Sequence, residues 1–142
     1  MKAVDTGILY RNPKPHLLSR HAFFPSVAPL PDGRLVATYT IGEAFEAVDL
    51  HTEVAVSPDG GNEWQPMGPA FAWPDGAPRC EACRITPLPD GSLVAIITEF
   101  DRASHPEDGL SNEHTLGLVD TRFHLSRSTA AGETWSTPEP VP

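Results

Sequence analysis

One segment of nine residues occurs twice in this chain of 142 residues, and it restricts the fold more than any other feature. PLPDGRLVA at Pro29–Ala37 returns as PLPDGSLVA at Pro87–Ala95, with eight of nine positions identical at an offset of 58. A second pair follows at an offset of 71, SPDGGNEW at Ser57–Trp64 and STAAGETW at Ser128–Trp135. The sequence therefore predicts a duplicated supersecondary unit of about 60–70 residues, with a longer loop in the second copy.

Each unit is predicted to contain four short strands. The repeated Pro-Asp-Gly favours a tight turn, because Pro presets φ near −65° and Gly accepts positive φ. The expected strands are rich in Val, Ile, Thr and aromatic residues, and no segment shows the 3.6-residue apolar period of an amphipathic helix. They cover 23–30, 34–41, 52–57 and 64–72 in the first unit, and 80–88, 92–100, 121–128 and 135–141 in the second.

Four antiparallel strands repeated at this period are typical of a β-propeller blade. The sequence thus predicts an all-β fold with about two blades, residues 20–76 and residues 77–142. Residues 1–19 are expected to form an N-terminal extension or a strand that closes the final blade. Two blades alone leave open faces and unpaired edges. We therefore expect further blades in a longer chain, or self-association, to close the propeller.

Composition excludes several classes of partner. The 19 acidic residues exceed the 10 basic ones, the net charge is −9 and no Lys/Arg run occurs, so nucleic acid and anionic membranes are unsuitable partners. The chain lacks a transmembrane segment and a signal-peptide pattern, so a cytoplasmic location is the default expectation. Cys80 and Cys83 lie on one expected strand, where residues three apart face opposite sides. We interpret them as incidental thiols, and expect no metal and no cofactor.

The turn SPDGGNEW carries a family resemblance. Its S-x-D-x-G-x-x-W pattern, placed between the third and fourth strands of a unit, resembles the Asp-box, or bacterial neuraminidase repeat, of the sialidase-like superfamily. The resemblance covers nearly the whole chain from about residue 20 and implies a sialidase-type β-propeller with six blades in an intact protein. The matching residues are Ser57, Asp59, Gly61 and Trp64 in the first box and Ser128, Gly132 and Trp135 in the second, where Ala130 replaces Asp.

The residue types in the two boxes favour a structural role. Ser hydroxyls and Asp carboxylates bind backbone N–H groups of their own turn, Gly supplies a left-handed conformation, and Trp packs between sheets. The loss of the Asp at Ala130 argues against catalysis, because a catalytic acid is less easily replaced than one turn hydrogen bond. We therefore expect any chemistry to lie elsewhere.

Strand order predicts where that site lies. In an up-and-down blade, the Pro-Asp-Gly turns and the Asp-boxes lie at the same end. The loops between the second and third strands lie at the opposite end, together with the connections between blades. In the sialidase-like family that second end carries the active site. The segments expected there are 42–51, 99–120 and the starts of the two first strands, near Arg20 and near Arg79 and Arg84. Long loops in compact domains are often functional.

The resemblance also implies glycosidase chemistry, in which a carboxylic acid protonates the leaving oxygen. In sialidases a Tyr acts as nucleophile, and an Arg cluster holds the substrate carboxylate. The candidate acid is one of Glu43, Glu46 and Asp49 in the first loop. The candidate substrate-binding residues are Arg84, Arg20, Asp101 and Arg102.

Two departures leave the activity open. The family begins its first blade with aromatic-Arg-Ile-Pro, whereas this chain has AFFP at Ala22–Pro25, with Phe23 in place of the Arg. Tyr10 and Tyr39 are interpreted as packing residues, so the Tyr nucleophile is expected from a later blade. We therefore keep two functions open: a sialidase-like glycoside hydrolase acting on glycans, and a non-catalytic glycan- or protein-binding propeller. A scaffolding repeat with a degenerate site is a third reading.

Overall fold

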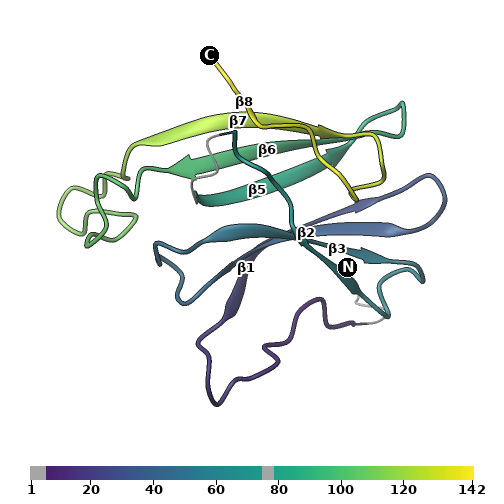
Figure 1. Ribbon diagram of the computed structural model, residues 1–142, viewed down its shortest axis with the longest axis horizontal. Helices are drawn as coiled ribbons and strands as arrows, with labels where there is room; N and C mark the ends of the chain where they lie inside the picture. Colours follow the sequence, from purple (N-terminus) through teal and green to yellow (C-terminus); the bar gives the residue numbers. More distant parts are fainter. Residues whose placement is uncertain (1–5, 75–78) are drawn as a thin grey trace.

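The computed structural model describes residues 6–74 and 79–142, and these residues form strands, turns and loops without a helix. The eight strands make two four-stranded antiparallel sheets (Figure 1), which confirms the predicted all-β class. No helix in this described part is long and apolar enough to cross a membrane. The first sheet contains β1 (His21–Pro29), β2 (Leu35–Gly42), β3 (His51–Ser57) and β4 (Gln65–Pro69), and the second contains β5 (Cys80–Pro87), β6 (Leu93–Phe100), β7 (Thr121–Ser128) and β8 (Glu139–Pro140).

The outermost strand of each sheet is shorter than predicted. β4 has five residues instead of the predicted 64–72, and β8 has two instead of 135–141. Proline has no N–H to donate to a sheet, so proline-rich strands pair only briefly and at sheet edges. In the second sheet, pairing is restricted to His124 with Pro140 and Leu125 with Glu139.

The two Pro-Asp-Gly turns have the same construction. The Gly33 N–H donates to the Leu30 carbonyl oxygen at 3.0 Å, and the Gly91 N–H donates to the Leu88 carbonyl oxygen at 2.9 Å. Gly33 has a φ of 88° and Gly91 a φ of 82°. These angles are accessible to glycine at little cost, which is why both copies of the repeat have Gly at this position.

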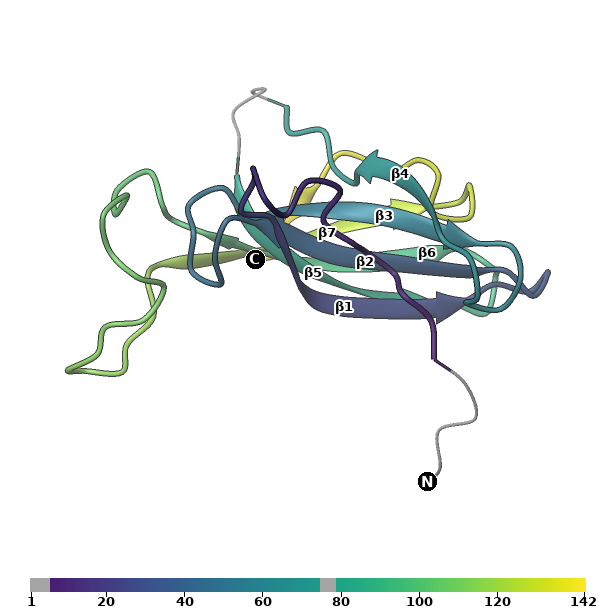
Figure 2. The same ribbon diagram turned by 90° about the horizontal axis from the view of Figure 1, so that it is seen from below.

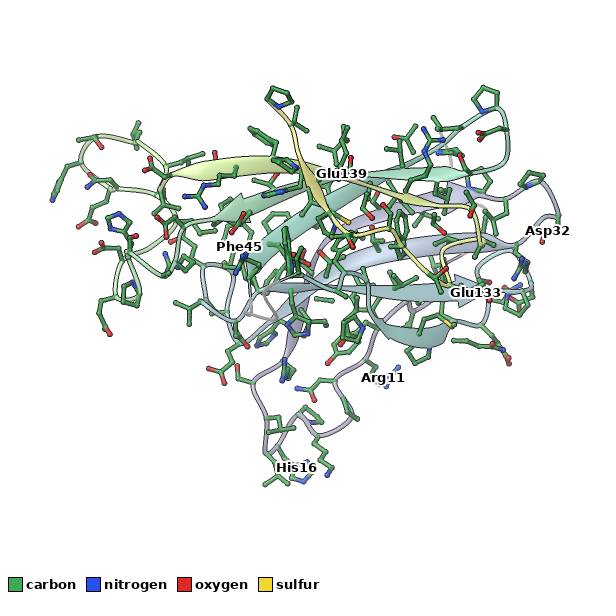
Figure 3. All side chains as sticks on the ribbon, turned by 45° about the horizontal axis from the view of Figure 1, so that its top comes forward. Arg11, His16, Asp32, Phe45, Glu133 and Glu139 are labelled. Atoms are coloured by element: carbon green, nitrogen blue, oxygen red, sulfur yellow. The ribbon has the colours of Figure 1, made fainter. Side chains whose placement is uncertain are left out.

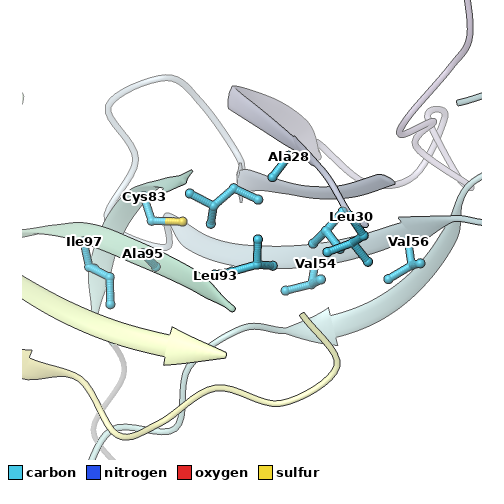
Figure 4. Close-up of a cluster of buried hydrophobic side chains, with 10 residues drawn as sticks. Ala28, Leu30, Val54, Val56, Cys83, Leu93, Ala95 and Ile97 are labelled. Carbon is cyan, nitrogen blue, oxygen red and sulfur yellow. The ribbon is translucent and has the colours of Figure 1, made fainter. Parts of the chain in front are cut away.

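The two sheets pack against each other around one hydrophobic core (Figure 4). They use opposite faces for this contact. Thr38 of β2 is fully buried in the first sheet, whereas its repeat equivalent in β6, Ile96, is 51 % exposed. The sheets therefore stack in the same direction, as successive blades do. The buried core residues are Ala28, Leu30, Val36, Val54 and Val56 from the first unit and Cys83, Ile85, Leu93, Ala95 and Ile97 from the second.

The two outer faces differ. On the first sheet, Leu9 and Tyr10 cover the face that contains Tyr39 and Ile41, with the Tyr10 and Tyr39 rings 5.8 Å apart. The covering segment 6–10 takes no strand conformation, and its role as a closing strand stays a prediction. The start of the N-terminal extension, residues 1–5, and the predicted boundary between the blades at 76–77 lie outside the described residues. The outer face of the second sheet is open.

Strand order separates the two ends of the molecule. The Pro-Asp-Gly turns gather at one end with the turns 57–64 and 128–135, and the loops 43–50 and 101–120 lie at the other (Figures 1 and 2). The turns 57–64 and 128–135 carry the pattern that resembles an Asp-box, and we call them the first and second Asp-box for that pattern alone. Figure 3 labels Asp32 and Glu133 at the turn end and Phe45 toward the loop end. We call these the turn end and the loop end below.

Candidate functional site

The first Asp-box uses its polar groups within its own turn. The Ser57 hydroxyl accepts the Gly61 N–H at 2.8 Å and donates to Asp59 Oδ1 at 2.9 Å. Trp64 Nε1 donates to the Gly61 carbonyl oxygen at 3.1 Å. Ser57 is fully buried. Its hydroxyl is therefore engaged in turn geometry and is not presented to a substrate.

The second Asp-box repeats this construction without a carboxylate. The Ser128 hydroxyl accepts the Gly132 N–H at 2.9 Å, and Trp135 Nε1 donates to the Gly132 carbonyl oxygen at 3.0 Å. Ala130 still donates its N–H to the Ser128 hydroxyl, at 3.3 Å. Ser, Gly and Trp thus suffice to form the turn, and the Asp adds further hydrogen bonds to it.

Two adjoining cavities lie at the loop end. The first-loop cavity has a volume of about 590 Å³ and the second-loop cavity about 400 Å³, and Val48 and Arg79 line both. The polar residues and the Trp of the first-loop cavity are Arg20, Asp49, His51, Thr52, Trp73, Arg79 and Glu81. The charged residues of the second-loop cavity are Arg79, Glu99, Asp101, Arg102 and Arg122.

Asp49 is fixed at the first-loop cavity by its own loop. Its Oδ1 accepts the Glu43 N–H at 3.0 Å, and its Oδ2 lies 3.9 Å from Arg20 Nη1. The Asp49 carbonyl oxygen is 2.9 Å from His51 Nδ1. The structure therefore brings together two of the predicted site residues, Asp49 and Arg20, in one cavity.

Glu81 is a buried carboxyl group in the same cavity. It is 3 % exposed. Its Oε1 accepts the Thr52 N–H at 3.2 Å and its Oε2 accepts Trp73 Nε1–H at 2.8 Å. Burial raises the pKa of the Glu81 carboxyl above its ordinary value, and the hydrogen bonds from Thr52 and Trp73 oppose that rise. Glu81 is thus the described cavity carboxyl whose environment most favours the protonated form.

Arg102 contributes unsatisfied donors to the second-loop cavity. It is 8 % exposed, and its Nη2 donates to the Glu46 carbonyl oxygen at 3.4 Å. Its Nε and Nη1 have no hydrogen-bond partner among the described residues. A buried donor without a partner is costly, which makes these nitrogens candidates for binding oxygen atoms of a ligand.

Asp101 lies beside Arg102 in this cavity and is held as an anion. Its Oδ1 accepts the Ser104 N–H at 3.1 Å. This bond, and to a lesser extent the positive charge of Arg122, lowers the pKa of the Asp101 carboxyl. The predicted pair Asp101 and Arg102 therefore shares one cavity.

A polar network joins the two cavities. The Arg79 guanidinium lies over the Trp73 ring, 5.2 Å from its centroid, and its Nε is 2.9 Å from Glu99 Oε1. The other oxygen of Glu99 is 2.7 Å from His124 Nε2. The His124 ring meets the Trp73 ring edge to face at 4.9 Å. This network fixes the wall between the cavities with charged groups that are already paired.

Three predicted site residues lie elsewhere. Glu43 lines neither cavity, and its backbone N–H supports Asp49. Glu46 faces the longer loop, where its Oε1 accepts the Ser111 hydroxyl at 3.3 Å. Arg84 lies on β5 away from both cavities, and its Nη1 donates to the Phe24 carbonyl oxygen at 2.7 Å.

The sequence interpretation missed several cavity residues. Glu81, Glu99 and Trp73 were not among the predicted site residues, and Arg122 lies at the start of an expected strand. The only available signal was Glu81, a charged residue inside the apolar strand pattern CEACRI. An acid at a buried strand position is unusual unless it is hydrogen-bonded.

The thiols and histidines give no metal site within the described residues. Cys80 and Cys83 are buried and unbonded, and they belong to different apolar clusters. Burial raises the pKa of each thiol to about 11, which keeps both protonated and unreactive near neutral pH.

Comparison with solved structures identifies the fold. A protein of unknown function from Dyadobacter fermentans DSM 18053 matches with a TM-score of 0.69 and 22% identity, over 99% of this chain and 40% of that chain. A Hadza microbial sialidase matches with a TM-score of 0.60 and 20% identity, over 84% of this chain and 25% of its own. The α-L-arabinanase of Penicillium chrysogenum, solved with arabinobiose, matches with a TM-score of 0.57 and 23% identity, over 81% of this chain and 30% of its own.

The sialidase and the arabinanase have propeller-type glycosidase folds, so the chain is a partial β-propeller, as predicted. It spans 40% or less of the length of these three structures. No family model matches the sequence, and no curated protein matches it. At these identities the similarity establishes the fold and not the activity.

Proposed function

We propose that this chain forms part of a glycoside hydrolase propeller that acts on a glycan at the loop end, opposite the Asp-box turns. The observation that carries the proposal is the first-loop cavity, in which Asp49 and the buried Glu81 line the same space. A glycosidase needs one carboxyl group that keeps its proton and a second group that remains ionised. Such a pair can arise where burial favours the protonated form of one of two neighbouring acids.

The roles follow from the surroundings of each acid. Glu81 is the candidate proton donor, because burial raises the pKa of its carboxyl. Asp49 is the candidate anionic partner, with Arg20 3.9 Å from its Oδ2. Of the three acids in the first loop, Asp49 is the one that lines the cavity with Glu81, so it is preferred to Glu43 and Glu46.

Glycan binding is assigned to the paired charges around the two cavities. Sugar hydroxyls both donate and accept hydrogen bonds, and they are suited to sites with carboxylates and guanidinium groups side by side. Arg102 supplies the two unpartnered nitrogens, Asp101 supplies an ionised acceptor, and Arg20 borders the first-loop cavity. Arg84 is assigned a positioning role, because its guanidinium binds a backbone oxygen.

The test is turnover of two fluorogenic substrates, an α-L-arabinofuranoside and an α-sialoside. We expect Asp49→Asn to lower kcat at least 100-fold while leaving the melting temperature within a few degrees, because the amide oxygen still accepts the Glu43 N–H. Glu63→Gln, at an exposed position in the Asp-box turn, is the matched control and should retain activity. Equal turnover by the Asp49→Asn variant would contradict the assignment. No sialoside turnover above a Glu43/Glu46/Asp49 triple-Ala variant would exclude the sialidase version.

A non-catalytic glycan-binding domain is the second candidate. It is favoured by the fact that both Glu81 oxygens already accept N–H donors, from Thr52 and from Trp73. Under this alternative, the hydrogen bonds of Glu81 stabilise the contact between the two sheets, and the cavities bind sugar without cleaving it. Glycan binding with no turnover of either fluorogenic substrate would select this alternative.

A further inference from the structure

Three phenylalanine rings gather at the loop end, apart from the polar cavities. Phe23 and Phe24 lie on β1, and Phe45 belongs to the loop that also contains Val48 and Asp49. The Phe45 ring centroid is 5.6 Å from that of Phe23 and 5.2 Å from that of Phe24. Phe45 is 54 % exposed and lies toward the loop end in Figure 3. We call these three rings the phenylalanine platform.

The backbone of the platform is held in an unfavourable conformation. Phe24 has a φ of 49° and lies within the register shift between Phe23 and Ser26 in the pairing of β1 with β2. This left-handed region is disfavoured for residues with a Cβ, and such conformations are concentrated at functional sites. Arg84 supports the bulge, because its Nη1 donates to the Phe24 carbonyl oxygen at 2.7 Å. The bulge turns the Phe24 ring toward Phe45 instead of continuing the alternation of β1.

The platform borders space that a ligand can enter. Phe24 lines a small cavity of about 270 Å³ together with Arg84, Ile96 and Phe100. On its other side, the loop of Phe45 continues into Val48, which lines both polar cavities. Aromatic rings that are partly exposed near polar groups are the usual composition of a small-molecule site, in which apolar walls surround a few polar groups.

The two polar cavities are lined by acidic and basic groups in equal number. The four arginines and four carboxyl groups are Arg20, Arg79, Arg102 and Arg122, with Asp49, Glu81, Glu99 and Asp101. Arg79 is paired with Glu99 at 2.9 Å and Arg20 lies 3.9 Å from Asp49, whereas two nitrogens of Arg102 have no partner among the described residues. Such a site offers hydrogen bonds in both directions to the hydroxyl groups of a sugar.

We propose that the phenylalanine platform binds a neutral sugar residue, which stacks its C–H face on Phe24 and Phe45 and turns its hydroxyls toward the charged groups of the cavities. The C–H groups of a sugar carry partial positive charge and are attracted to the negative face of an aromatic ring. A carboxylated sugar would place its charge near the carboxyl groups of Asp49, Glu99 and Asp101. This inference rests on the proposed glycan site and specifies the class of sugar that the site prefers.

The test compares matched neutral and carboxylated ligands by saturation-transfer NMR and titration of the whole chain. The probes are lactose and 3′-sialyllactose, with arabinobiose as a second neutral ligand. We expect the neutral probes to bind at least tenfold more tightly than 3′-sialyllactose. Saturation should be transferred from the protein to the C–H protons of the sugar ring. Phe45→Ala should weaken this binding at least fivefold.

Phe24→Gly separates a ligand role from a packing role. Glycine relieves the positive φ and so offsets part of the packing lost with the ring, and this variant should stay folded at the temperature of the titration and yet lose at least fivefold in affinity. Leu116→Gly is the matched control, because Leu116 is an exposed apolar residue with a φ of 57° in the other loop. It should leave affinity unchanged.

Three outcomes would overturn the inference. Tighter binding of 3′-sialyllactose would exclude a neutral-sugar site, and unchanged affinity in both phenylalanine variants would exclude the platform. In either case glycan binding itself, and turnover that depends on Asp49, would still support the proposed function. Failure of every probe to bind would overturn both proposals.

Discussion

At the scale of single residues, the second Asp-box offers a direct measure of what its missing acid contributes. In the first box, Asp59 Oδ1 accepts the N–H groups of Asn62 at 3.1 Å and Glu63 at 3.0 Å. The N–H of Glu63 and the Ser57 hydroxyl are the main causes that lower the pKa of the Asp59 carboxyl. At Ala130 the side-chain acceptor is missing, and the Glu133 N–H, the repeat equivalent of the Asn62 N–H, donates instead to the Ala130 carbonyl oxygen at 2.9 Å.

Ala130→Asp should therefore stabilise the second box. The new carboxylate would accept the N–H group of Thr134, which is the repeat equivalent of the Glu63 N–H that donates to Asp59. We expect the melting temperature to rise by roughly 2 °C, measured by differential scanning calorimetry. Asp59→Ala, which removes the acid of the first box, should lower the melting temperature. A fall in melting temperature for Ala130→Asp would show that the two turns are not equivalent.

The pair of His51 and Glu53 predicts a pH dependence at the rim of the first-loop cavity. His51 Nε2 lies 3.5 Å from Glu53 Oε1. Their hydrogen bond raises the pKa of His51 above its ordinary 6.5 and lowers the pKa of Glu53 below its ordinary 4.5. The His51 contribution to stability is present below pH 6.5 and is lost as pH rises through its folded-state pKa; the Glu53 contribution is present above pH 4.5 and is lost as pH falls.

Both contributions therefore coexist between about pH 4.5 and pH 6.5. Glu53→Gln should cost up to about 1 kcal/mol of unfolding free energy near pH 5.5 and less near pH 8. Urea denaturation at the two pH values measures the difference. The Gln amide still accepts the Tyr39 hydroxyl, so the ion pair is the part removed. An equal loss at both pH values would show that the charge on His51 is not involved.

At the scale of elements, the two box glycines have the same backbone role and different surroundings. Gly61 has a φ of 103° and Gly132 a φ of 83°. A Cβ built on Gly61 would lie 3.5 Å from Leu35 Cδ1, an ordinary contact, whereas a Cβ on Gly132 would lie 2.6 Å from Val36 Cγ1. The second Asp-box turn therefore presses against β2 of the first sheet.

Gly132→Ala should thus cost more than Gly61→Ala. Positive φ alone costs about 1–2 kcal/mol for a residue with a Cβ, and the clash with Val36 should bring the cost for Gly132 to roughly 3 kcal/mol. Chemical denaturation of both variants tests the order. Equal losses would mean that the inter-sheet contact at Gly132 relaxes freely.

The elements were predictable because the sequence repeats. The paired turns located six of the eight strands to within two residues at each end and indicated which loops share an end. The lengths of β4 and β8 were overestimated, because their prolines interrupt pairing while the residues between them still match a strand pattern. The site was less predictable. Asp49 and Arg20 lie in two segments that strand order places at the same end, the loop between β2 and β3 and the start of β1. Glu81 and Trp73 reach the first-loop cavity through packing between the sheets, which strand order alone does not predict.

At the scale of the whole molecule, the open face of the second sheet is the main apolar surface that no other sheet covers. Ile96, Phe123 and Leu125 are exposed there, at the side that the first sheet uses to receive the second. We propose that a further blade covers this face, either within a longer protein or from another copy. The similar solved structures are longer than this chain.

This proposal predicts concentration-dependent association of the 142-residue chain. Ile96→Lys with Phe123→Lys should abolish the association, because two buried ammonium groups cannot be accommodated between sheets. Sedimentation velocity over a range of concentrations measures it. The control is Glu133→Lys at an exposed turn residue, because a Lys on the covered side of the first sheet would be an unsuitable control. A monomer at every concentration would contradict self-association and leave the longer protein as the remaining form.

Glycan binding at the loop end, and not at the Asp-box turns, can be tested by a backbone amide NMR titration of the chain with arabinobiose. We expect the largest chemical-shift changes within residues 42–51, 79–81 and 99–103. Largest changes within residues 57–64 or 128–135, or no change at millimolar ligand, would contradict it.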